Sequence, residues 1–183
     1  DVNEMPAFRP TGFTINENLS SLDVSSSVSD EDGDTITYSL GGGDGGLFNI
    51  SSAGVLTLKT GQNFDYELQS SYSFQIGISD GTNSQFPLIS IIVNNLNDNA
   101  PVFVTIPTSA AENQTAIGCF VVTDSDLFNP APTPAPNCGI ASGLTLSISG
   151  DNLQVNSVGY LSFISAPDYE TKTSYTATVS ASD

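Results

Sequence analysis

The stretch NNLNDNAPVF, residues 94–103, stands between two series of short apolar runs. It gathers oxygen-bearing side chains at 97–99 and then reaches Pro101, which has no N–H to give to a regular hydrogen-bond ladder. A related stretch, NEMPAF at residues 3–8, stands near the start of the sequence. The same order of acidic landmarks follows both stretches, so the chain is predicted to contain one unit written twice.

The acidic landmarks of the two copies can be matched one by one. Their spacing is constant to within one residue up to Asp126. It is longer from Asp168 onward, because the second copy carries an inserted proline-rich stretch, LFNPAPTPAPNC, at 127–138. The matched pairs are Asn3 and Asn97, Glu4 and Asp98, Glu17 and Glu112, Asp30 and Asp124, Asp32 and Asp126, Asp65 and Asp168, Glu67 and Glu170, and Asp80 and Asp183.

Hydrophobic periodicity indicates strands rather than helices. In 72–79 the side chains of Tyr72, Phe74, Ile76 and Ile78 alternate with small or polar ones, as in a half-buried strand. Similar short runs separated by Gly, Asn, Asp and Ser predict a β-sandwich in each copy. The further runs are 19–28, 35–40, 55–58, 86–93, 116–122, 144–148, 160–164 and 175–179.

We therefore expect an all-β chain with two domains, 1–99 and 100–183. The first copy continues past Asp80 through the run 86–93, whereas the second copy ends at Asp183, the counterpart of Asp80. The second domain is thus expected to lack its last strand. Either the sequence stops inside a longer array of repeats, or a neighbouring chain donates a strand.

The charge balance narrows the class of partner. Twenty Asp and Glu residues face only Arg9, Lys59 and Lys172, so the formal net charge of the 183 residues is −17. Such a chain repels nucleic acid and anionic membranes and attracts cations. No apolar run is long enough to span a bilayer.

The acid pairs with one residue between them suggest metal binding. In extended backbone this spacing puts both carboxylates on one face, where they repel unless neutralised. Solvated loop charges would explain one such pair, but four pairs in register favour a hard cation with oxygen ligands. Ca²⁺ tolerates mixed carboxylate, amide and carbonyl ligands better than Mg²⁺ does, and the absence of His disfavours zinc or copper. The pairs are Asp30 and Asp32, Asp65 and Glu67, Asp124 and Asp126, and Asp168 and Glu170.

Taken together, FDYE, NLNDNAPVF, TDSD and the two strand ends at Asp80 and Asp183 resemble the calcium-binding motifs of tandem cadherin repeats. The resemblance covers nearly the whole chain. It implies a seven-stranded Greek-key sandwich in each repeat and about three Ca²⁺ ions at each junction between repeats. The implied ligands of the junction here are Glu17, Asp65, Glu67, the Leu96 carbonyl, Asn97, Asp98, the Asn99 carbonyl, Asp124, Asp126 and Asp183.

The same resemblance implies two half-sites, expected to be empty or weakly occupied without a neighbouring repeat. The N-terminal half-site comprises Asn3, Glu4, Asp30, Asp32 and Asp80; the C-terminal one comprises Glu112, Asp168 and Glu170. Three departures stand out: Asn95 replaces the usual first Asp of the linker, Glu4 replaces another Asp, and a carbonyl ligand expected near 141–143 cannot be placed. Asp34, beside Gly33, is interpreted as a turn residue, with an extra ligand as the alternative.

Two further features bear on the compartment. Cys119 and Cys138 flank the insertion, and in an extracellular protein a bridge between them is favoured over two thiols. Asn18, Asn49 and Asn113 each begin a glycosylation sequon. An extracellular location, at a cell surface or secreted, is the expectation.

The function that follows is calcium-dependent stiffening of a repeat pair for cell adhesion or an adhesive array. The expected partners are calcium, neighbouring repeats and a homophilic or heterophilic protein, with no nucleic acid and no membrane insertion. Adhesion by exchange of a Trp-anchored strand is unavailable, because the chain has no Trp. The alternative is a carbohydrate-binding or scaffolding module of a matrix or filament, in which Phe13, Tyr160 or Phe163 would stack on sugars. No nucleophile–base arrangement is present, so we expect no enzyme.

Overall fold

In the computed structural model, which describes residues 2–59, 61–127 and 138–183, the predicted alternation at 72–79 forms strand β8 (Ser71–Ser79). The side chains of Tyr72, Phe74, Ile76 and Ile78 are all buried, at 4% exposure or less. No α-helix occurs among the residues described; two short 3-10 turns accompany the strands. The fold is all-β, as predicted. Most of the proline-rich insertion, 128–137, lies outside the described residues.

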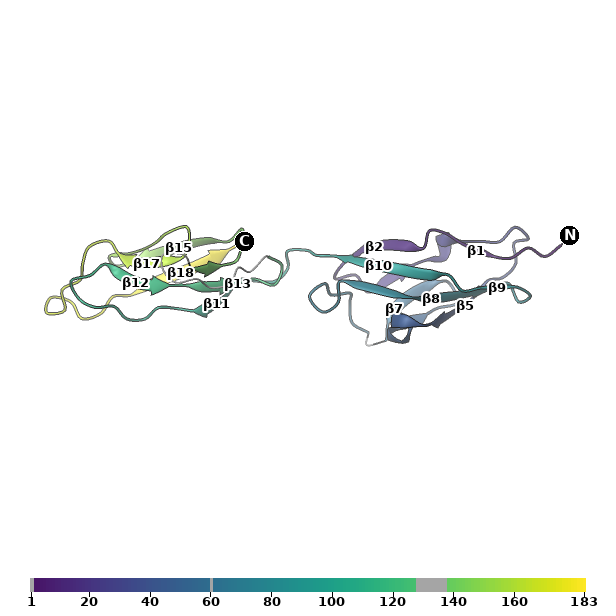
Figure 1. Ribbon diagram of the computed structural model, residues 1–183, viewed down its shortest axis with the longest axis horizontal. Coiled ribbons are helices and arrows are strands. Elements are labelled where there is room, and N and C mark those ends of the chain that lie inside the picture. Colours follow the sequence, from purple (N-terminus) through teal and green to yellow (C-terminus); the bar gives the residue numbers. More distant parts are fainter. Residues whose placement is uncertain (1, 60, 128–137) are drawn as a thin grey trace. The chain divides into compact units, whose positions relative to one another are not determined.

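The chain divides into two units, Asp1–Leu96 and Asn97–Asp183. In the first, one sheet has the strand order β2-β10-β8-β5 with β9 beside β8, a second has the order β3-β7-β6, and β1 pairs with β4 (Figure 1). The strands are β1 (Ala7–Phe8), β2 (Gly12–Asn16), β3 (Ser21–Asp23), β4 (Val28–Ser29), β5 (Thr37–Gly41), β6 (Phe48–Ile50), β7 (Val55–Leu58), β9 (Ser84–Gln85) and β10 (Leu88–Asn94).

Seven passes of the described chain build this sandwich, because β1 and β2 belong to one pass, β3 and β4 to another, and β9 and β10 to a third. The strand expected over 19–28 is therefore wrong as a single element: the 3-10 turn η1 (Ser25–Ser27) interrupts it. Asp23 causes the interruption, since its carboxylate accepts a hydrogen bond from the Ser25 N–H at 2.9 Å. Apolar side chains of both sheets, among them Leu56 and Phe74 at 0% exposure, pack between the layers as one core.

The parallel pairing of β10 with β2 matters most for the site. Residues Ser90–Asn94 run beside Gly12–Asn16, while the other edge of β10 pairs antiparallel with β8. The segment that follows β10 consequently lies beside the residue that follows β2, which is Glu17. The local sequence of residues 12–16 does not predict this pairing, because it depends on a distant strand.

In the part of the second unit that the structure describes, the plan is repeated without a counterpart of β10. Its sheets have the orders β11-β13-β14, β12-β17-β16 and β15-β18 (Figure 1). The strands are β11 (Val102–Thr105), β12 (Ala116–Cys119), β13 (Val121–Thr123), β14 (Gly139–Ile140), β15 (Thr145–Gly150), β16 (Leu153–Val155), β17 (Tyr160–Phe163) and β18 (Ala177–Ser182).

Without that strand the second core stays open on one side. A hollow of about 460 Å³ is lined by Ile106, Phe120, Leu161 and Val179, among others. In the first unit, Ile89, Ile91 and Val93 of β10 are inside the core, at 0–1% exposure. A disulfide between Cys119 and Cys138 ties β12 to the residue before β14, with 5.2 Å between the Cα atoms.

Candidate metal centres

Glu17 is a charged residue inside the first unit, with only 3% of its surface exposed. Its N–H donates to the Asn94 carbonyl at 3.2 Å, continuing the pairing of β2 with β10. Its carboxylate accepts the Leu96 N–H at 2.6 Å and the Tyr66 N–H at 2.9 Å. One buried carboxylate thus ties the segment after β2, the 65–68 turn and the segment after β10 together.

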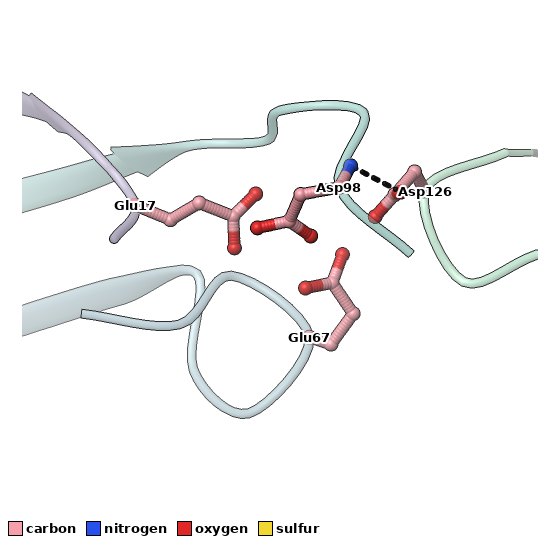
Figure 2. Close-up of side chains that lie close together, drawn as sticks. All are labelled: Glu17, Glu67, Asp98 and Asp126. Carbon is pink, nitrogen blue, oxygen red and sulfur yellow. Dashed lines mark hydrogen bonds between the residues drawn. The ribbon is translucent and has the colours of Figure 1, made fainter. Parts of the chain in front are cut away.

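The 65–68 turn presents the second acid of this unit. Phe64, 1% exposed, anchors it: the Phe64 N–H donates to the Leu19 carbonyl and the Phe64 carbonyl accepts from the Asn18 N–H, both at 2.9 Å. Glu67 projects from the turn toward Glu17, and one carboxylate oxygen of each lies within 4.8 Å of the other (Figure 2). Two like charges this close favour a cation between them.

In the second unit, Asp126 organises the start of the chain segment 97–101. One of its carboxylate oxygens accepts the Asp98 N–H at 2.8 Å, drawn in Figure 2, and the Asn99 N–H at 2.7 Å. The other accepts the Asn99 side-chain amide at 2.8 Å. The carboxylate oxygens of Asp98 and Asp126 also approach within 4.8 Å. This pair repeats the acid-on-acid arrangement seen in the first unit.

The first unit contains the counterpart of the Asp98–Asp126 contact. The Glu4 N–H donates to Asp32 at 2.8 Å, the same bond at the same length between matched residues. A side-chain hydrogen bond with Asp32 raises the pKa of Glu4, and desolvation and the charge of Asp32 add to the shift. Two separately folded units therefore build the same contact from the duplicated sequence.

Asp34 was interpreted as a turn residue, with an extra ligand as the alternative. Carboxylate oxygens of Asp30, Asp32 and Asp34 lie within 4.8 Å of one another, so Asp34 is part of an acidic trio as well as of a turn. One oxygen of Asp30 accepts the Asp34 N–H at 3.0 Å; the other is buried with no hydrogen-bond partner. The alternation Asp-x-Asp-x-Asp was the available sequence signal.

The expected geometry of the acid pairs was wrong, because they lie in turns rather than in extended backbone. The first Asp of each pair accepts a backbone N–H from two to four residues ahead, which shapes the turn. These acceptor and donor residues are Asp30 and Asp34, Asp65 and Leu68, Asp124 and Asp126, and Asp168 and Glu170, at 2.8–3.0 Å. At least one oxygen of each first Asp is thus engaged by its own turn.

Not all expected ligands come together. Among the residues described, Glu112, Asp168 and Glu170 form no acidic cluster comparable with the two above. Glu112 is exposed where its counterpart Glu17 is buried, because the second unit has no segment equivalent to the one that covers Glu17. Asp65, Asp80, Asp124 and Asp183 likewise stand outside the acidic clusters.

Asp80 and Asp168 each close a local turn. Asp80 accepts the N–H groups of Thr82 and Asn83 at 2.6 Å, and the Asn83 N–H is the main cause of its lowered pKa. Asp168 accepts the Thr171 hydroxyl at 2.9 Å, and this bond is the main cause of its lowered pKa. Both carboxyls are therefore held in the charged form that a cation requires.

Of the aromatic residues considered for sugar stacking, none offers an open platform. Phe163 is 7% exposed and packs against Tyr175, with ring centroids 4.9 Å apart. Phe13 packs against the first core, and Tyr160 is half-buried. The sequons lie on exposed residues: Asn49 on β6, and Asn18 and Asn113 in turns with φ of 67° and 58°.

Comparison with known proteins shows which proteins this chain resembles. Residues 3–87 match the family described as "Bacterial Ig domain". The chain is 33% identical over 186 residues to protocadherin Fat 4 of Mus musculus, covering 92% of this chain and 4% of that protein. It is 40% identical over 80 residues to protocadherin-15 of Homo sapiens, covering 42% of this chain and 4% of that protein. The chain thus spans a small fraction of the length of these relatives.

Solved structures give the fold. Human protocadherin-24 EC1-2 matches with a TM-score of 0.69 at 18% identity, covering 98% of this chain and 94% of that one. Drosophila N-cadherin EC1-4 matches with a TM-score of 0.63 at 20% identity, covering 98% and 48%. The chain therefore has the fold of a pair of tandem cadherin-like repeats, the second without its last strand. Immunoglobulin and cadherin domains share the sandwich architecture, so the match to a bacterial Ig domain agrees with this fold.

Among the described residues, no helix has the length and apolar character that crossing a membrane requires.

Proposed function

We propose that this chain is a calcium-binding segment of an extracellular array of cadherin-like repeats, in which Ca²⁺ stiffens the connection between units for adhesion or assembly. The observation that carries the proposal is a hydrogen bond that occurs in both units. In each, a backbone N–H of the linker segment before the first strand donates to an aspartate carboxylate. Glu4 binds Asp32, and Asp98 binds Asp126, each at 2.8 Å. In each contact the carboxylate fixes the linker backbone beside a second acid, so two acidic side chains are held where one cation would neutralise both.

The donor chemistry fits calcium. Carboxylate, amide and carbonyl oxygens make up the whole set, and a flexible mixed set of this kind suits Ca²⁺ better than Mg²⁺. A buried Asp30 oxygen without a hydrogen-bond partner is a further point in favour. We propose about three ions around the linker. Their ligands would be Glu17, Asp65, Glu67, Leu96, Asn97, Asp98, Asn99, Asp124, Asp126 and Asp183.

The linker sequence explains how ions would change stiffness. Glu17 of the first unit holds the Leu96 N–H, and two residues later Asp126 of the second holds the Asp98 N–H. Without ions, both carboxylates face like charges in a chain of net charge −17. Bound Ca²⁺ would neutralise them and stabilise the folded linker by mass action. The division into repeats at 99/100 belongs to the same proposal.

We also propose an extracellular location, an adhesive role and no catalytic activity, because the similar proteins are of the cadherin type. The relatives are protocadherins by name, and the disulfide between Cys119 and Cys138 suits an oxidising compartment. The aromatic burial described above gives no support to the sugar-binding alternative.

The test compares the 183-residue chain with and without calcium. We expect isothermal titration to give calcium binding, Tm to fall in EDTA, and small-angle scattering to show greater bending in EDTA. Asp98→Ala should weaken calcium binding at least tenfold, whereas Asp151→Ala, a charge-matched control far from the linker in sequence, should not. The proposal would be refuted if the Tm and the small-angle scattering profile were the same in calcium and in EDTA.

A further inference from the structure

The five-stranded sheet of the first unit is uncharged. Strands β2, β5, β8, β9 and β10 contain no Asp, Glu, Lys or Arg, although the chain has 23 such residues. Charged residues are the usual means by which a solvent-facing sheet avoids association. In so acidic a chain, the lack of charged residues on the exposed side of this sheet is not explained by packing of the core.

An apolar strip crosses the outer face of this sheet. Strand register places Leu88 beside Gln75 and Ile92 beside Ser71, while Ile89 and Ile91 point into the core. Leu88 is 63% exposed and Ile92 54%. Phe86, 62% exposed, lies on the same face, since a Cβ added at Gly77 of β8 would meet its ring at 2.9 Å.

The rest of this outer face is small and neutral. Register and exposure assign to it Gly12, Thr14, Asn16, Thr37, Ser39, Gly41, Ser71, Ser73, Gln75, Ser90 and Asn94. The nearest charged groups lie at its margins. Arg9 lines a hollow with Gly12 and Gln85, and Asp44 accepts the Ser73 N–H at 2.7 Å beyond the end of β5. Glu17 and Asp80 follow the ends of β2 and β8.

Glycosylation would leave this face open. Asn49 lies on β6 in the opposite sheet, and Asn18 lies in the turn after β2. Neither sequon of the first unit falls on the strands of the five-stranded sheet. The uncharged face is thus bare of charge and of candidate glycans.

We infer that this uncharged face, the outer side of β2-β10-β8-β5, docks a second copy of the same chain. Two copies with a net charge of −17 repel wherever acids face acids. Contact through this face buries the Phe86, Leu88 and Ile92 strip while keeping the acids apart. A basic partner would be drawn to the acidic surfaces instead. A two-fold pairing needs only one self-complementary patch.

The size of the face indicates a weak contact. Four strands about 4.8 Å apart and about 25 Å long cover roughly 500 Å² per copy. About 1,000 Å² in total lies at the low end of specific interfaces and is typical of transient ones. Many repeats presented together would strengthen such a contact by avidity. The inference goes beyond the proposed function, because the face contains no proposed ligand side chain and docking needs no ion.

The test is sedimentation equilibrium of the 183-residue chain up to about millimolar concentration, in calcium and in EDTA. We expect reversible dimers in both conditions. High salt should strengthen them, because it screens the repulsion between copies. Leu88→Glu with Ile92→Glu should weaken dimerisation at least tenfold. Leu88→Ser with Ile92→Ser should also weaken it without changing charge. Circular dichroism and Tm check folding.

Val104→Glu is the matched control, since Val104 is a strand residue of the second unit with 61% exposure. It should leave dimerisation unchanged. A chain that stays monomeric at every concentration and salt level would overturn the inference, as would a Val104→Glu effect equal to that of the Leu88 and Ile92 variants. Calcium binding by all variants should match the parent chain. A lost dimer with intact calcium binding therefore separates this inference from the calcium proposal.

Discussion

Asp126→Asn tests the acidic linker contact with the smallest change in shape. The Asp126 carboxylate accepts the Asp98 N–H, the Asn99 N–H and the Asn99 side-chain amide at 2.7–2.8 Å. An asparagine has one acceptor oxygen, so its amide would face one of these donors. One hydrogen bond is lost, and the other two lose the assistance of a negative charge.

The magnitude follows from these contacts. Hydrogen bonds to a charged group contribute about 1.5–3 kcal/mol each and neutral ones about 0.5–1.5, so replacing three charged bonds by two neutral ones removes roughly 3.5–6 kcal/mol before solvent exposure is considered. Asp126 is only half-buried, which reduces this figure to about 1–2 kcal/mol. The substitution also removes the repulsion between the carboxylates of residues 98 and 126, which stabilises the folded state by about 1 kcal/mol. Without calcium, the net loss of stability is therefore expected to be within about 1 kcal/mol.

With calcium, the same variant should behave differently. It loses a charged ligand of the proposed site, and a tenfold weaker affinity corresponds to about 1.4 kcal/mol. Calorimetry in calcium and in EDTA should therefore show a smaller calcium-induced rise of Tm for Asp126→Asn than for the parent chain. Asp151→Asn, which removes the exposed ion pair with Lys172, serves as the control. An equal calcium-induced rise for both variants would refute the reasoning.

Three other predictions concern the chain without calcium. Glu17→Gln should destabilise the first unit by about 1–3 kcal/mol in urea, because a 3% exposed carboxylate bonded to two N–H groups is altered, whereas Glu112→Gln, at an exposed position, should have little effect. The Ser25 N–H lowers the pKa of Asp23 below 3.8; its stabilising effect is therefore present above that pH and lost as pH falls through the folded pKa. Asp23→Asn should narrow the difference between Tm at pH 7 and at pH 3, and an unchanged difference would contradict this assignment. Cys119→Ser with Cys138→Ser should cost the second unit about 3 kcal/mol, since the bridge closes a separation of 19 residues; the same loss in the first unit would speak against it.

Much of the fold was accessible from local pattern. The alternation of Tyr72, Phe74 and Ile76 predicted β8, and 55–58 predicted β7 with its bounds. The run 19–28 failed as one strand because the Asp23 carboxylate accepts a hydrogen bond from the Ser25 N–H, which competes with the strand, and apolar periodicity does not register such a bond. β2 was not predicted, because its short run GFTIN becomes a strand only by pairing with β10, far away in the sequence.

The candidate site shows the same division. Repetition of acids identified Asp32 and Asp126 as matched residues, and their bonds to Glu4 and Asp98 are matched as well. The extended geometry assumed for the pairs was wrong, because short-range hydrogen bonds from backbone N–H groups to Asp carboxylates fold each pair into a turn. The alternation Asp-x-Asp-x-Asp was visible in the sequence, but the approach of the Asp34 carboxylate to those of Asp30 and Asp32 depends on that turn.

The sequence by itself determined that this chain holds one β-sandwich unit twice, with its acids in register and almost no basic residues to neutralise them. That information is carried by periodicity and repetition, which are local or arithmetic properties of the chain. Only the tertiary structure decided that Glu17 is buried while its duplicate Glu112 is exposed, and that five strands combine into an uncharged face. Both outcomes depend on β10, because burial and exposure are set by which distant segment lies alongside.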